Sequence, residues 1–138
     1  GWREFEWRWQ LRSTTPHPYA QPMWDGRPLA GRPILLHAEQ GLGDTIQFIR
    51  YASRVQALGG RVVARCQPAL ARLLRSCPGI DALHTADDTL EPCDVRAPLM
   101  SLPGLLGTTR ESEPAAQPYL SAEPALVGRW RRALERAL

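Results

Sequence analysis

The chain has 138 residues, of which 43% are hydrophobic and 22% charged, which suits a single globular domain with a core of its own. Its 17 basic residues are all arginine and are interleaved with 14 acidic residues, so no basic stripe indicates nucleic-acid binding. No apolar run approaches the length of about 18 residues that a membrane span requires, and we expect neither a span nor a nucleic-acid partner.

The cysteines and the first residue bear on the cellular compartment. Cys66, Cys77 and Cys93 are odd in number and lack CxxC spacing, so we expect neither a disulfide framework nor a metal site. We expect three small, buried thiols in a protein of the reducing cytoplasm. No leader peptide is visible, but this says little about location, because Gly1 in place of methionine indicates a fragment of a longer protein.

The start of the chain divides into an aromatic element and a connector, which together form a separate piece over residues 1–32. Helical and strand spacing fit equally well for the aromatic side chains Trp2, Phe5, Trp7 and Trp9. Five prolines and Asp25-Gly26 then predict an irregular connector over residues 13–33. We expect all five tryptophans of the chain to serve in packing, with sugar stacking by Trp24 as the alternative.

The rest of the chain alternates between extended and helical patterns. Strands are predicted at residues 34–38, 61–66, 80–83 and 93–97, and helices at residues 44–58, 68–77, 99–107 and 124–138. The last helix carries one packing stripe at four-residue spacing, formed by Leu126, Trp130, Leu134 and Leu138. This alternation predicts the α/β class: a Rossmann-like three-layer domain over residues 33–122, with a mostly parallel sheet of about four or more strands, and then a linking helix over residues 123–138.

The turn between the first strand and the first helix is the candidate site. Gly41 and Gly43 let a ligand approach the backbone, and the N–H groups that open the helix offer an anion site. A Walker loop is excluded because the chain has no lysine. A dinucleotide is disfavoured because Ile46 stands where a third small residue belongs and no acidic residue ends the second strand. We therefore expect no cofactor and no metal, and a turn that wraps a sugar or a phosphosugar.

Asp44 is the candidate catalytic group of this turn, and it also has a structural explanation. As an N-cap residue, Asp44 would accept a hydrogen bond from the Gln47 N–H, and the Gln47 side chain would reach back in a capping box. We expect Glu39 to be solvated or bound to the backbone rather than catalytic. His37 is expected to be a core imidazole, with a position in the cleft as the alternative.

Several stretches of the chain resemble a known group of proteins. Residues 37–51, HAEQGLGDTIQFIRY, are similar to a segment of bacterial tetratricopeptide-repeat proteins that have a glycosyltransferase-like C-terminal region. The opening GWxxFEWR, the later WDGxPLxGR, and the motifs PLMSLP and PYL resemble the same proteins in the same order. That region is in turn similar to the heptosyltransferase family, whose two Rossmann-like halves form the GT-B arrangement.

The resemblance implies that the chain is the acceptor-side half of a GT-B-type glycosyltransferase domain. Asp44, in the Leu-Gly-Asp turn, would be the catalytic base, and the amides of Thr45 and Ile46 would stabilise negative charge. The expected substrate-binding residues are Gln40, Gly41, Leu42, Gly43, Thr45 and Ser101.

The implied partners are a nucleotide-sugar donor and a sugar or protein acceptor, with further protein partners recruited by repeats that precede this region. The fragment is expected to be inactive alone, because in the family the second half binds most of the donor. The alternative is a non-catalytic protein-interaction module on the same fold, since function depends on sites rather than folds. Whether the chain belongs to an enzyme therefore stays open.

Overall fold

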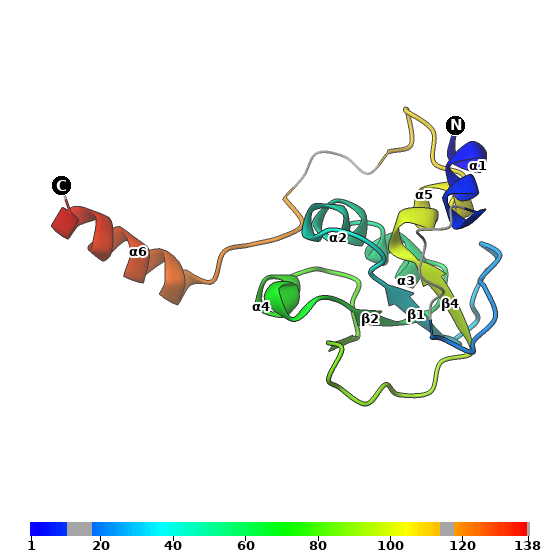
Figure 1. Ribbon diagram of the computed structural model, residues 1–138, viewed down its shortest axis with the longest axis horizontal. Helices are drawn as coiled ribbons and strands as arrows, with labels where there is room; N and C mark the ends of the chain where they lie inside the picture. The colour runs from blue at the N-terminus through cyan, green and yellow to red at the C-terminus, as the bar shows by residue number, and fades with distance from the viewer. Residues whose placement is uncertain (11–17, 114–117, 138) are drawn as a thin grey trace.

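The computed structural model describes residues 1–10, 18–113 and 118–137, and a four-stranded sheet lies at its centre (Figure 1). The strands are β1 (Pro33–His37), β2 (Arg61–Arg65), β3 (Ala82–His84) and β4 (Val95–Pro98). Each neighbouring pair is parallel, in the order β3-β2-β1-β4. Helices flank this sheet, so the predicted α/β class and Rossmann-like fold are confirmed.

The helices follow the strands largely where the pattern predicts them. The segment between β1 and β2 contains α2 (Leu42–Ile49) and α3 (Ala52–Ala57). The 3-10 turn η2 (Pro68–Leu70) and α4 (Ala71–Leu74) follow β2, and η3 (Leu99–Ser101) and α5 (Leu102–Leu105) follow β4. The helix predicted over residues 68–77 is thus shorter in the structure, because a 3-10 turn takes its first three residues and the α-helical part ends at Leu74.

The prediction of one continuous helix over residues 44–58 is wrong at its start and in its middle. The helix begins at Leu42, two residues earlier, because Gly41 already takes the extended conformation of an N-cap, with φ −69° and ψ 166°. It is interrupted between Ile49 and Ala52, where the Tyr51 N–H donates to the Phe48 carbonyl at 3.2 Å, an i→i−3 bond that tightens the turn.

The strand order fixes the part of the sheet where a ligand is expected. The chain passes from β1 to β2 to β3 in one direction, and then returns to place β4 on the other side of β1. The connections that leave β1 and β4 therefore diverge, and the carboxyl ends of these strands meet at a topological switch point. Open α/β sheets bind their ligands at this edge.

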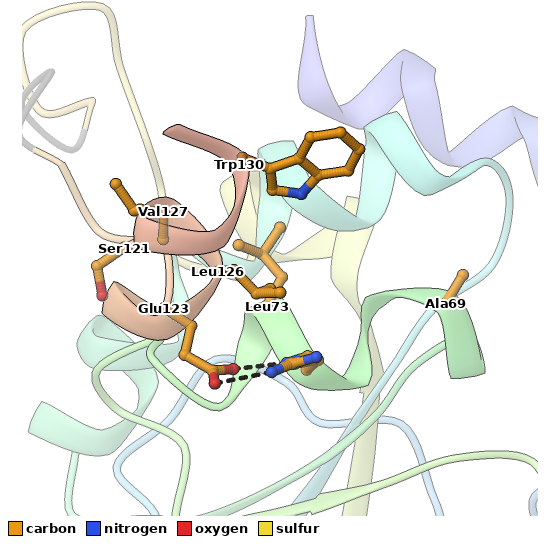
Figure 2. A pocket seen from close by; sticks show the side chains of 9 residues that line it. Ala69, Leu73, Ser121, Glu123, Leu126, Val127 and Trp130 are labelled. Carbon is orange, nitrogen blue, oxygen red and sulfur yellow. Dashed lines mark hydrogen bonds and ion pairs between the residues drawn. The ribbon is translucent and has the colours of Figure 1, made fainter. Parts of the chain in front are cut away.

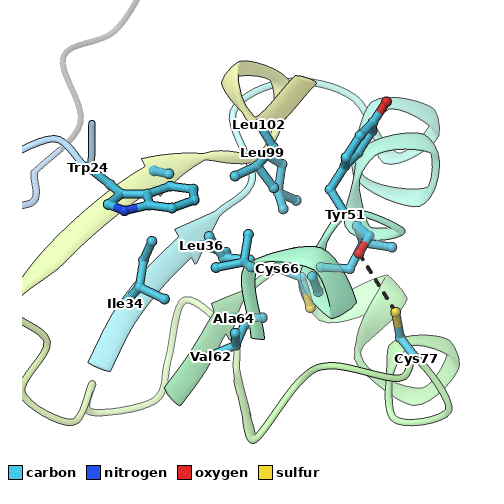
Figure 3. Close-up of a cluster of buried hydrophobic side chains, with 14 of the residues drawn as sticks. Trp24, Ile34, Leu36, Tyr51, Val62, Ala64, Cys66, Cys77, Leu99 and Leu102 are labelled. Carbon is cyan, nitrogen blue, oxygen red and sulfur yellow. Dashed lines mark hydrogen bonds between the residues drawn. The ribbon is translucent and has the colours of Figure 1, made fainter. Parts of the chain in front are cut away.

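The hydrophobic core lies where the segments after β1 and β4 and the connector pack against the sheet. Figure 3 shows Leu36 of β1 near Leu99, and Ile34 of β1 near Trp24. Ile34, Leu36, Leu99 and Leu102 are all almost completely buried. Trp24 belongs to the same cluster and donates from its indole N–H to the Arg27 carbonyl at 2.9 Å. The expectation that Trp24 packs is confirmed, because only 2% of the residue is exposed.

Part of the proline-rich connector extends the sheet in an irregular way. The Arg96 N–H of β4 donates to the Pro22 carbonyl at 2.9 Å, and the Trp24 N–H donates to the Arg96 carbonyl at 2.8 Å. Leu29 is completely buried in the core. Residues 22–29 therefore contribute to the same core as the strands. The part of the connector at residues 11–17 lies outside the described residues.

The aromatic N-terminal element is helical, which the periodicity alone left open. It consists of α1 (Trp2–Phe5) and the 3-10 turn η1 (Glu6–Gln10). The Trp2 ring packs edge-on against Phe48 of α2, with ring centroids 6.4 Å apart. The expectation of packing is wrong for Trp7 and Trp130, which are 63% and 61% exposed.

The last helix, α6 (Pro124–Ala137), projects away from the sheet, as Figure 1 shows in red. The predicted helix is confirmed, but its packing stripe is not covered: none of its residues is buried by the rest of the described chain. Leu138 of that stripe lies outside the described residues. Among the helices that the structure describes, none has the length and apolar character needed to cross a membrane.

Candidate functional site

A hollow of about 280 Å³ lies at the carboxyl edge of the sheet, beside the predicted glycine turn. Arg65, at the end of β2, supplies its positive charge, and the guanidinium lies 5.7 Å from the centre of the Tyr19 ring. Arg65 also donates to the Ala86 carbonyl at 2.6 Å, which holds the cation at the rim. The residues that line the hollow are Tyr19, Ala38, Glu39, Gln40, Arg65, Cys66, Gln67, Pro68 and Ala86.

Gln67 fixes the position of the glycine turn relative to β2. Its side-chain amide donates to the Gln40 carbonyl at 2.9 Å, and its oxygen accepts from the Thr45 hydroxyl at 2.9 Å. Thr45 is buried, and its hydroxyl lies within 3.3 Å of the Gly41 carbonyl as well. Of the expected substrate-binding residues, Gln40 lines the hollow, whereas Thr45 serves to hold the turn.

Asp44 closes the turn, although not in the predicted way. It is the third residue of α2, and its Oδ2 accepts the Gly41 N–H at 3.1 Å. The expected bond from the Gln47 N–H to an N-cap Asp44 is wrong, because Gly41 is the N-cap and only the carboxylate half of a capping box forms. The other carboxylate oxygen has no hydrogen bond within the part of the chain that the structure describes.

The amide groups available to an anion differ from the predicted pair. The Thr45 N–H donates to the Gly41 carbonyl at 3.2 Å, the first bond of α2, and Ile46 lies deeper in the same helix. The amides without an intrahelical acceptor are therefore those of Leu42, Gly43 and Asp44. A Cβ atom added to Gly43 would meet nothing within 4 Å, so the backbone is open to a ligand there.

The N-terminal element is bonded to the residues that follow β1 and β4. Arg8 of η1 is buried and forms a two-point ion pair with Glu39, from Nε to Oε2 at 3.0 Å and from Nη2 to Oε1 at 3.1 Å. The same Arg8 Nη2 donates to the Ser101 hydroxyl at 2.7 Å, and that hydroxyl donates to Glu6 at 3.0 Å. This network joins the loops that follow β1 and β4.

Glu39 is therefore not solvated as expected, because its side chain is only 4% exposed. The expected backbone bond is confirmed: the Met100 N–H donates to Oε1 at 3.2 Å. Burial raises the pKa of the Glu39 carboxyl, and the Arg8 cation opposes that rise. The sequence did not reveal Arg8, whose partners lie 31 and 93 residues away along the chain.

Two further candidates fall outside the hollow. Ser101, an expected substrate-binding residue, is buried and bonded to Arg8 and Glu6. His37 is completely buried, with its ring centroid 4.7 Å from that of Tyr19, and the prediction of a core imidazole is confirmed.

The described residues contain no group of three or more histidine, cysteine, aspartate or glutamate side chains placed to hold a metal. Cys66 and Cys77 are buried free thiols, as expected, and Cys93 is half-buried. Comparison with models of protein families, with curated proteins and with solved structures finds no significant match to the chain.

Proposed function

We propose that this chain is the acceptor-side half of a GT-B-type glycosyltransferase domain, and that a sugar acceptor binds at the carboxyl edge of the sheet. The observation that carries the proposal is the position of the hollow, which adjoins the turn at Gln40 and therefore the exposed start of α2. The similarity of residues 37–51 to glycosyltransferase-like regions supports the same interpretation.

The hollow has the groups that a polar, anionic ligand requires. Arg65 can pair with a phosphate or carboxylate, and the Tyr19 ring offers a face against which a sugar ring can stack. The amides of Leu42, Gly43 and Asp44 add partial positive charge from the N-terminus of α2. A sugar that carries an acidic group fits this combination better than an uncharged one.

Asp44 would act as the base in the proposed reaction. Its carboxylate takes the proton of an acceptor hydroxyl while that oxygen forms a bond to the anomeric carbon, and the bond to the nucleotide diphosphate breaks with inversion. The Gly41 N–H holds one carboxylate oxygen in place at 3.1 Å. The absence of a side chain at Gly43 leaves room for the acceptor beside Asp44.

A second candidate is a non-catalytic interaction module, and one observation favours it. Asp44 accepts the Gly41 N–H and does not line the hollow. This placement is the one expected of an aspartate whose only role is to cap the helix. In this interpretation the fold is kept and the turn has no reaction to perform.

A ligand titration and an activity assay separate the candidates. We expect sugar phosphates to shift the NMR resonances of residues 40–45 in the isolated chain, and Arg65→Gln to weaken that binding about tenfold. Arg27→Gln is the control, because Arg27 is exposed and, among the described residues, forms an ion pair only with Asp25, at 3.2 Å. In the intact protein, Asp44→Asn should lower nucleotide release by about 100-fold or more.

The side-chain oxygen of the amide introduced by Asp44→Asn can still accept the Gly41 N–H, so this variant should lose less than about 1 kcal/mol of stability. Unchanged nucleotide release in Asp44→Asn would exclude Asp44 as the base. Binding of no sugar, sugar phosphate or nucleotide sugar would favour the interaction module.

A further inference from the structure

Helix α6 separates its apolar and basic residues onto two faces. The apolar residues Leu126, Trp130, Ala133, Leu134 and Ala137 follow the helical spacing of positions 0, +4, +7, +8 and +11. On the other face, Ala125 is followed at +4, +7 and +11 by Arg129, Arg132 and Arg136. No charged residue interrupts the apolar face.

The start of α6 is held against α4, and the remainder is exposed. The Arg72 guanidinium of α4 forms a two-point ion pair with Glu123, at 2.5 and 2.7 Å. Figure 2 shows Leu126 and Leu73 close together, with Trp130 over the same hollow of about 360 Å³. Beyond this first turn the described residues leave the apolar face uncovered, since Trp130 and Leu134 are 61% and 60% exposed.

The charge of α6 indicates what covers this face. The helix carries Arg129, Arg131, Arg132 and Arg136 against the single acidic residue Glu135, four positive charges against one negative, which leaves +3. None of the four arginines forms an ion pair with another described residue. The surface that complements α6 is therefore both apolar and anionic.

We infer that α6 binds the surface of a lipid bilayer that contains anionic lipids. The helix would lie in the plane of the headgroups, with Trp130 and Leu134 inserted toward the acyl chains and the arginines among the phosphates. The indole of Trp130 suits this interface because it combines a large apolar ring with a polar N–H. A nucleic acid would satisfy the arginines but leave the apolar face uncovered, and an uncharged protein groove would do the reverse.

Vesicle flotation with the whole chain tests this inference. We expect the chain to float with vesicles of phosphatidylcholine and phosphatidylglycerol, and to bind vesicles of phosphatidylcholine alone at least about tenfold more weakly. High salt should reduce binding to the anionic vesicles, because screening weakens the attraction between arginine and phosphate.

Two matched variants separate a lipid surface from general attraction between charges. Ala133→Glu places a carboxylate on the apolar face, and Ala125→Glu places the same carboxylate among the arginines; both alanines are exposed. Both changes lower the charge equally, so Ala133→Glu should reduce binding about tenfold more than Ala125→Glu. Urea unfolding of both variants, expected to match the parent chain, verifies that the fold is intact.

Three results would overturn the inference. The first is no flotation with anionic vesicles, and the second is an equal loss of binding in both variants, which indicates attraction by charge alone. The third is a dimer, seen by sedimentation without lipid, that Ala133→Glu dissociates; a second copy of the chain would then cover the apolar face.

Discussion

At the scale of single residues, the ion pair between Arg8 and Glu39 carries the greatest desolvation cost. Both side chains are less than one tenth exposed, so each has lost most of its hydration. A buried charge is tolerated only when it is paired and hydrogen-bonded, and here Glu6, Ser101 and the Met100 N–H complete the network. The pair therefore binds the N-terminal element to the loops after β1 and β4.

We predict that Glu39→Ala lowers the free energy of unfolding by about 3 kcal/mol, because it leaves the Arg8 cation buried without its partner. The double variant with Arg8→Met should be less destabilised than the sum of the single variants by about 2 kcal/mol. Urea unfolding of all four proteins measures this coupling. The exposed ion pair of Arg27 and Asp25 is the control, with an expected coupling energy of about 0.5 kcal/mol or less. Equal coupling energies in the two pairs would contradict the prediction.

A second prediction at this scale concerns Cys77. Burial raises the pKa of its thiol from about 9 to about 11. The folded state thus keeps a proton that the unfolded state releases in this range, so stability should fall as the pH rises from about 9 to about 11. Cys77→Ala removes this contribution, and its unfolding free energy should depend less on pH than that of the parent chain. Identical pH profiles would show that the thiol does not contribute.

At the scale of elements, two glycines have opposite roles. Gly79 has φ +84°, and a Cβ there would lie 2.3 Å from the Ser53 nitrogen in α3. The turn before β3 can therefore approach α3 only because position 79 has no side chain. Gly43 in α2 has open space around its missing Cβ. Neither the backbone conformation nor the packing at position 43 requires a glycine. A glycine there is instead consistent with a position that must stay open for a ligand.

We predict that Gly79→Ala destabilises the chain by about 3 kcal/mol or more, through both the clash and the strained φ. Gly43→Ala should instead stabilise it by up to about 1 kcal/mol, since alanine favours a helix. Thermal unfolding measures both changes. If Gly43→Ala stabilises the fold and leaves sugar-phosphate binding unchanged, no ligand approaches the backbone at that residue.

At the scale of the whole molecule, the two ends of the chain contribute very differently to the fold. The element α1–η1 supplies Arg8 and Glu6 to the buried network at the switch point. Helix α6 buries none of its residues against the rest of the described chain. The sheet should therefore depend on the first ten residues far more than on the last helix.

A pair of deletions tests this difference. Removing residues 1–10 should cost about 3 kcal/mol or more, because Glu39 and Ser101 lose the hydrogen bonds and ion pair that Arg8 and Glu6 supply. Removing everything after Glu123 should change the free energy of unfolding by less than about 1 kcal/mol, because exposed residues contribute little. Urea midpoints of the two truncated chains give the comparison, and equal losses would contradict it.

The sequence by itself determined the parts of this protein that depend on neighbours along the chain. The apolar run at residues 34–38 and the turn residues around it predicted β1, and the alternation of patterns predicted the parallel sheet and the α/β class, because burial imposes a local period on a strand or a helix. The position of Asp44 near the start of α2 was predictable for the same reason.

Only the tertiary structure decided which polar groups meet. Arg8 pairs with Glu39 across 31 residues and with Ser101 across 93, and no local period encodes partners so far apart. These contacts placed Ser101 in the buried network. The strand arrangement also brings Arg65 and Tyr19 together at the hollow beside the glycine turn. These placements depend on the strand order β3-β2-β1-β4, which brings the ends of distant segments to one edge of the sheet.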